Sequence, residues 1–169
     1  MRPAGALLIL GACMAFAAVG TKQRSRRLQT LNGLDAALRL MEAEIEARAV
    51  TLPELAGFLS VRSSCGAARF FQLLSSSLDA LGERPFYCLW TACVRQALPE
   101  LKETERQTLN ELGRSLGRYS LECQTRAIRL CRDRLRQEAA AARESFARDR
   151  RLIWGLSFAC GAFLLILLL

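Results

Sequence analysis

Two long stretches without a charged side chain, one near each end of the chain, constrain the fold more than any other feature of the sequence. The first runs from Pro3 to Gly20 and the second from Leu152 to Leu169. As a helix, each stretch would be about 27 Å long, close to the minimum that crosses the hydrocarbon core of a bilayer. We therefore expect one transmembrane helix at residues 3–20 and another at residues 152–169.

The charges beside these stretches predict which side of the membrane the middle of the chain faces. Only Arg2 is basic on an outer side, whereas the inner flanks carry Lys22, Arg24, Arg26, Arg27, Arg143, Arg148, Arg150 and Arg151. Basic flanking residues stay predominantly in the cytoplasm. Residues 21–151 are therefore expected to form a cytoplasmic domain of a multi-pass protein of the cell membrane.

Two other interpretations of the N-terminal stretch stay open. Ala15–Ala17 offers the small residues of a signal-peptidase site, and Leu10–Cys13 loosely resembles a lipoprotein signal. Either signal would export the chain. The basic cluster that begins at Lys22 opposes translocation, so a retained anchor is the favoured prediction.

The net charge of +8 is concentrated beside the predicted membrane helices. Between Leu28 and Ala142 the basic and acidic residues nearly balance, and the excess in the flanks suits anionic lipid headgroups. Few aromatic residues lie between the basic ones, although single-stranded nucleic acids are usually bound by stacking on such rings. We expect a lipid bilayer as a partner and no nucleic acid.

Little in the composition supports catalysis. The chain has no histidine, and it contains no G-x-x-x-x-G-K-[ST] segment that would bind ATP. Its seven cysteines show neither CxxC nor zinc-ribbon spacing, so buried small apolar side chains are the simplest interpretation. We predict that the protein is not an enzyme and has no catalytic residue, no cofactor and no metal site.

The middle of the chain has the hydrophobic periodicity of α-helices. Apolar residues recur every three or four positions in a first helix, at Leu31, Leu34, Leu38, Met41 and Ile45. Four shorter helices are expected. The first follows a capping box at Thr51–Glu54, and the second stops at Gly82. The third begins at Pro85 and ends before Pro99, and the fourth follows a second capping box at Thr104–Gln107. The predicted fold class is all-α, a multi-helix bundle.

A long C-terminal helix is predicted from Ser120 onward. No proline or glycine interrupts the chain until Gly155, and apolar residues recur every seven positions at Leu121, Ile128, Leu135 and Ala142. Continued into the second apolar stretch, this helix would have about 50 residues and a length of about 75 Å. We expect a stalk that carries the bundle and enters the membrane in one piece.

Gly113 and Gly117 lie four residues apart in a region that otherwise favours helix. Each glycine inside a helix costs about 1 kcal/mol relative to alanine. Gly113 is expected to permit the close approach of a neighbouring helix, and Gly117 to supply a left-handed helix end before Ser120. The alternative is a plain helix end with no such contact.

This glycine pair belongs to a segment that resembles a known family. The segment LNELGRSLGRYSLECQ at 109–124, together with LRLMEAEIEARAVTLPELA at 38–56 and the two terminal stretches, is similar to the stage III sporulation protein AB family of endospore-forming bacteria. The residues that match the family pattern are Leu112, Gly113, Leu116, Gly117, Glu122 and Gln124, while Ser120 stands where the family has aspartate.

The resemblance implies a function as well as a fold. The family resembles the cytoplasmic helical domain of the platform F protein of type II secretion and pilus systems. It implies a non-enzymatic platform in the mother-cell membrane around the forespore, within a channel complex, facing the ATPase stage III sporulation protein AA and other channel proteins. A homo-oligomer is compatible with this role. The alternative is a generic membrane-anchored helical adaptor or regulator with an unrelated partner.

Glu42 and Glu46 are candidate partner-binding residues. They are like charges one helical turn apart, an arrangement that disfavours an isolated helix, and they flank the predicted apolar stripe. Glu44 is expected to pair instead with Arg48. We expect Glu42 and Glu46 to meet basic residues of a partner; the alternatives are a solvated face and an internal contact with the arginine-rich C-terminal helix.

Overall fold

The computed structural model describes the backbone of residues 2–48, 51–78, 84–116 and 120–168, and the side chains of this range between residues 23 and 145. Six helices make up the described part: α1 Arg2–Arg48, α2 Leu52–Arg62, α3 Cys65–Ser77, α4 Phe86–Ala97, α5 Glu103–Ser115 and α6 Leu121–Leu168. The predicted all-α fold class is confirmed.

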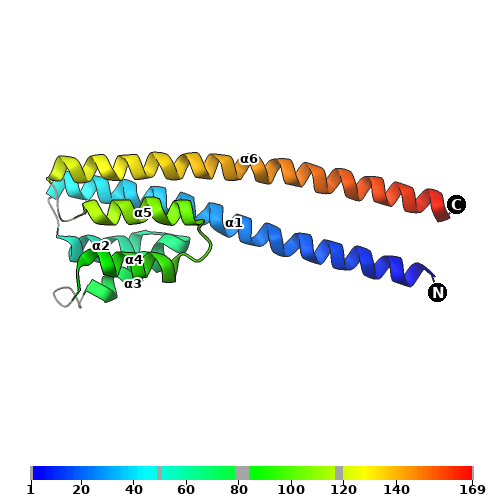
Figure 1. Ribbon diagram of the computed structural model, residues 1–169, viewed down its shortest axis with the longest axis horizontal. Coiled ribbons are helices and arrows are strands. Elements are labelled where there is room, and N and C mark those ends of the chain that lie inside the picture. The colour runs from blue at the N-terminus through cyan, green and yellow to red at the C-terminus, as the bar shows by residue number, and fades with distance from the viewer. Residues whose placement is uncertain (1, 49–50, 79–83, 117–119, 169) are drawn as a thin grey trace.

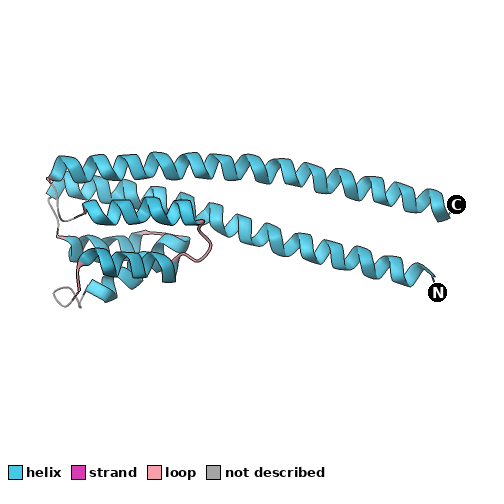
Figure 2. Ribbon diagram, in the orientation of Figure 1, coloured by secondary structure: helices cyan, strands magenta, loops and turns pink. Residues whose placement is uncertain are grey.

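Two long helices, α1 and α6, form the axis of the molecule (Figure 1). They run side by side, and both chain termini lie at the same end. The four short helices pack around the half of this pair that lies away from the termini (Figure 2). Both long helices continue without interruption through residues 20–21 and 151–152, the boundaries predicted between membrane and cytoplasmic segments. The predicted long C-terminal helix is confirmed.

The two predicted membrane spans fall on the outer parts of α1 and α6. Residues 3–20 and 152–169 lie outside the residues whose side chains are described, so these spans stay predictions. Among the described residues, no helix is long and apolar enough to cross a membrane.

The hydrophobic core lies between α1, α6 and the short helices. The predicted apolar stripe of α1 is buried completely, from Leu31 to Ile45. Across from it, the rings of Phe70 and Trp90 meet edge to face with their centroids 4.9 Å apart. Aromatic pairs of this geometry stabilise a core beyond the area that they bury. The periodicity of α1 therefore predicted its inward face correctly.

The starts of α2 and α5 show one correct and one wrong prediction. At α2, the Glu54 carboxylate accepts hydrogen bonds from the backbone N–H and the hydroxyl of Thr51, as expected. At α5, the predicted box at Thr104–Gln107 is wrong, because the N-cap residue is Lys102, two residues before Thr104. There the Glu105 carboxylate accepts the backbone N–H of Lys102 at 2.7 Å.

Helix ends and the α6 face also differ in part from the prediction. α4 begins after Pro85 and ends before Pro99 as expected, whereas α3 ends at Ser77 instead of reaching Gly82, which lies outside the described residues. The heptad pattern on α6 is wrong at Leu121, which is 46% exposed. Because α6 packs against both α1 and α5, its buried positions follow steps of three and four: Thr125, Ile128, Cys131, Leu135 and Ala139.

Candidate functional site

A row of ion pairs, which we call the charged seam, joins α1 to α6. It consists of Asp35, Glu42 and Glu46 on α1 and Arg129, Arg132 and Arg136 on α6. Asp35 Oδ1 lies 3.2 Å from Arg132 Nε and 2.9 Å from Arg136 Nε. Glu46 Oε1 lies 2.8 Å from Arg129 Nη2. Successive pairs advance along α1 while they go back along α6, so the seam fixes the antiparallel register of the two helices.

Glu42 is the most enclosed acid of the charged seam, and it contacts both Arg129 and Arg132. Burial by itself raises the pKa of Glu42, but the hydrogen bonds from the two guanidinium groups outweigh that effect and lower the pKa below its ordinary value. The same contact raises the pKa of Arg129. Both groups are therefore charged at neutral pH.

The structure gives Glu42 and Glu46 partners inside the chain. Arg129 bridges the two carboxylates and thereby relieves the repulsion that the sequence indicates. Of the arrangements considered from the sequence, the structure contains the internal contact with α6. A basic partner would have to compete with Arg129 and Arg132, and binding of a partner by this pair stays a prediction. Glu44 pairs with Arg48 as expected, with Glu44 Oε2 4.0 Å from Arg48 Nε.

Arg27, Glu105 and Glu138 form a second set of ion pairs, the Arg27 clamp, which ties α1 to α5 and α6. Arg27 Nε lies 3.0 Å and 3.2 Å from the two Glu105 oxygens, and Arg27 Nη2 lies 3.3 Å from Glu138 Oε2. The Glu105 side chain is fully buried. The sequence analysis did not predict this clamp. The only local signal at Glu105 is its position three residues after Lys102, which is typical of a helix start and does not indicate a contact with Arg27.

Gly113 lies inside α5, where Trp90 of α4 packs against it. A Cβ atom at this position would meet Trp90 Cδ1 at 2.4 Å, well inside any real contact. The indole is held in place because its Nε1 donates a hydrogen bond to the Leu109 carbonyl at 2.9 Å. Gly117 lies outside the described residues. Glu122 and Gln124 lie in the first turn of α6. The structural role expected of these two residues stays a prediction.

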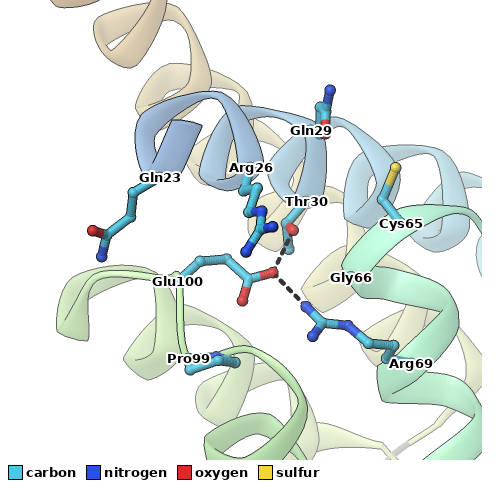
Figure 3. Close-up of a pocket in the computed structure, with 9 residues that line it drawn as sticks. All are labelled: Gln23, Arg26, Gln29, Thr30, Cys65, Gly66, Arg69, Pro99 and Glu100. Atoms are coloured by element: carbon cyan, nitrogen blue, oxygen red, sulfur yellow. Dashed lines mark hydrogen bonds and ion pairs between the residues drawn. The ribbon is translucent and has the colours of Figure 1, made fainter. Parts of the chain in front are cut away.

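A polar cleft of about 820 Å³ opens where α1, α3 and the α4–α5 connection meet (Figure 3). Its lining residues are Gln23, Arg26, Gln29, Thr30, Cys65, Gly66, Arg69, Pro99 and Glu100. Glu100 Oε1 accepts hydrogen bonds from Thr30 Oγ1 at 2.6 Å and Arg69 Nη2 at 2.9 Å. A Cβ atom on Gly66 would lie 2.8 Å from Glu100 Oε1, so glycine lets the carboxylate reach this place. Sequence reasoning did not identify this cleft.

The interpretation of the cysteines as buried apolar side chains is right for Cys93 and Cys131 and wrong for Cys65, Cys88 and Cys123, which are exposed. Burial raises the pKa of the Cys93 thiol, and it raises the pKa of Cys131 to about 12. Both thiols are therefore protonated at neutral pH and unsuited to nucleophilic attack. In the part of the chain that the structure describes, no group of three or more acidic, cysteine or histidine side chains could hold a metal ion.

The fold and the charged seam define a class of protein in which a small helical bundle is carried on an antiparallel pair of long helices. The chain belongs to the stage III sporulation protein AB family, whose family model matches residues 2–169. It is similar to stage III sporulation protein AB of Bacillus subtilis (strain 168), with 25% identity over 147 residues that cover 86% of this chain and 85% of the relative.

A solved structure of stage III sporulation protein AB has a similar fold. The TM-score is 0.64 at 23% sequence identity, and the match covers 72% of this chain and 97% of that one. The recognition made from the sequence is therefore confirmed at the level of the family.

Proposed function

We propose that this chain is a non-enzymatic membrane platform component of the sporulation channel between mother cell and forespore. In this role it couples a secretion-type ATPase, stage III sporulation protein AA, to a transenvelope complex with the other channel proteins. Membership of the family supports the sporulation context. The observation that carries the proposal is that α1 and α6 extend from the bundle at the same end (Figure 1).

The proposed membrane attachment uses the outer parts of these two helices. Residues 3–20 and 152–169 are the uncharged stretches, and they lie at the same end of the molecule (Figure 1). Residues 21–151 then form the cytoplasmic domain, because both inner flanks are basic. A hairpin of two neighbouring helices would hold the bundle close to the mother-cell membrane around the forespore.

The contacts between bundle and long helices suit a coupling role. The charged seam links α1 to α6, and the Arg27 clamp links both of them to α5. A displacement of the short helices is therefore passed to α1 and α6 through ion pairs and a packed core, rather than being absorbed by a flexible linker. The structural role expected of Gly113, Gly117, Glu122 and Gln124 belongs to this account, and it is supported by the packing of Gly113 against Trp90 of α4.

Co-purification from sporulating cells tests the proposal. The full chain carries an affinity tag and is extracted from membranes in a neutral detergent, and an unrelated tagged two-span protein serves as the control. The account expects the ATPase to be recovered with the chain and not with the control. Recovery of the chain without the ATPase, but with another cytoplasmic protein, would favour a generic membrane-anchored adaptor.

A further inference from the structure

We propose that the polar cleft binds the phosphodiester headgroup of an anionic phospholipid, with Arg26 and Arg69 as the phosphate ligands. This inference rests on the proposed membrane attachment of α1. It assigns a lipid-binding role to a surface that the platform function itself does not require.

Arg26 and Arg69 have donors to spare. The Arg26 guanidinium is exposed and points into the cleft toward Glu100 (Figure 3). It forms no ion pair within the described part of the chain. Arg69 is 59% exposed and gives only its Nη2 to Glu100. Since a guanidinium carries five N–H donors in a planar fork, both side chains can donate hydrogen bonds to phosphate oxygens.

Glu100 holds the Arg69 side chain in place and does not neutralise the positive charge of the cleft. Its Oε1 is engaged by Thr30 and Arg69, which fixes the Arg69 side chain at the edge of the cleft. Two arginines against one carboxylate leave the cleft with a net positive charge. Gln23 of α1 also lines the cleft, and its amide can bind headgroup hydroxyls.

The position of the cleft along α1 matches the level of lipid headgroups. Arg26 follows Gly20, the end of the apolar stretch, by about 9 Å of helix. The headgroup layer on each face of a bilayer is about 5 to 8 Å deep, and an arginine side chain reaches several ångströms further. The α4–α5 connection, which carries Glu100, lies at the end of the bundle nearer the termini (Figure 1). The cleft thus faces the proposed membrane surface.

A lipid suits this cleft better than a protein segment does. Grooves that bind helices or extended peptides are usually lined by apolar or aromatic side chains. Six of the nine residues that line this cleft are polar or charged, and none of the nine is aromatic. Basic pockets at the cytoplasmic edge of membrane helices commonly receive lipid headgroups.

Native mass spectrometry of the full chain in a neutral detergent tests the inference. The probes are short-chain phosphatidylglycerol, short-chain phosphatidylcholine and inorganic phosphate. The variants are Arg26→Gln with Arg69→Gln, Arg26→Gln alone, and a control pair, Arg95→Gln with Arg126→Gln, which removes equal charge from exposed positions outside the cleft. Arg26→Gln alone is expected to fold normally, because it breaks no ion pair among the described residues.

The expected result is that phosphatidylglycerol binds the wild type about tenfold more tightly than it binds the double cleft variant, and that the control pair behaves as the wild type. Arg26→Gln alone gives an intermediate affinity. The inference would be overturned by equal binding of phosphatidylcholine, by an equal loss in the control pair, or by displacement of the lipid by equimolar inorganic phosphate. Displacement by an equimolar acidic peptide would also overturn it and indicate a protein partner.

A second measurement separates this inference from the proposed function. Membranes that contain the wild type or the double cleft variant are washed with alkaline carbonate. If the wild type is washed off, the proposed membrane attachment fails. If it is retained, and the cleft variant binds phosphatidylglycerol as the wild type does, only the cleft inference fails.

Discussion

Glu105 of α5 is completely buried and faces Arg27 of α1, whose Nε lies 3.0 Å and 3.2 Å from its two carboxylate oxygens. The same carboxylate accepts the backbone N–H of Lys102 at 2.7 Å. One side chain therefore begins α5 and ties it to α1, just beyond the proposed membrane segment. Removing one member of a buried ion pair costs more than the pair contributes, because the remaining charge loses its partner.

Glu105→Gln should therefore lower the free energy of unfolding by about 3 kcal/mol. The matched control is Glu103→Gln on the same helix, which changes an exposed side chain and should shift the free energy by less than about 0.5 kcal/mol. Urea denaturation followed by circular dichroism measures both. Equal stability of the two variants would show that the Arg27 clamp does not hold the bundle to α1.

Gly113→Ala should destabilise the protein by about 1 to 3 kcal/mol. The added Cβ would lie 2.4 Å from Trp90 Cδ1, and Trp90 is held by its hydrogen bond to Leu109. The control is Gly57→Ala in α2, where nothing lies within 4 Å of the added atom. This control should stabilise by about 0.5 to 1 kcal/mol, as alanine does inside a helix. A neutral effect at Gly113 in thermal denaturation would contradict the close packing.

Reversing the acids of the charged seam, with Glu42→Arg and Glu46→Arg together, should reduce stability by about 1 to 3 kcal/mol. Adding Arg129→Glu should recover part of the loss, since Arg129 contacts both Glu42 and Glu46 and its pairs form again with exchanged signs; Arg132 is left unchanged because it also pairs with Asp35. Stability and co-purified ATPase are measured for each variant. Lost ATPase with unchanged stability would instead support the partner role predicted for Glu42 and Glu46.

The charged seam also predicts a pH dependence. The pKa of Glu42 lies below its ordinary value of 4.5 in the folded state, so its contribution to stability is present above pH 4.5 and is lost as the pH falls through the lower, folded pKa. Glu42→Gln should therefore be less stable than the wild type at pH 7, and the two curves should converge in acid. A constant difference in melting temperature from pH 7 to pH 3 would contradict this assignment.

Local patterns predicted much of the fold. The stripe from Leu31 to Ile45 and the start of α2 at Thr51 depend on residues within one or two helical turns, and both are found where the sequence indicates. The long α6 follows from an uninterrupted run of helix-forming residues. Each of these features is determined by neighbours in the chain, which a sequence displays directly.

Contacts between distant segments could not be predicted in the same way. The repulsion between Glu42 and Glu46 is visible in the sequence, but Arg129, which relieves it, lies 87 residues beyond Glu42. The partner of Glu105, Arg27, also lies 78 residues earlier in the chain. The cleft likewise joins three segments, and only folding brings Arg26, Arg69 and Glu100 together.

The central claim is that α1 and α6 enter the membrane from the same side and hold the bundle in the cytoplasm. Reporter fusions after Arg27 and before Arg143 test it most directly, with green fluorescent protein for the cytoplasm and alkaline phosphatase for the exported side. The account predicts fluorescence and no phosphatase activity at both positions, because both lie on the basic inner flanks. Phosphatase activity at either position would contradict the two-anchor topology and favour a cleaved or lipid-modified N-terminus.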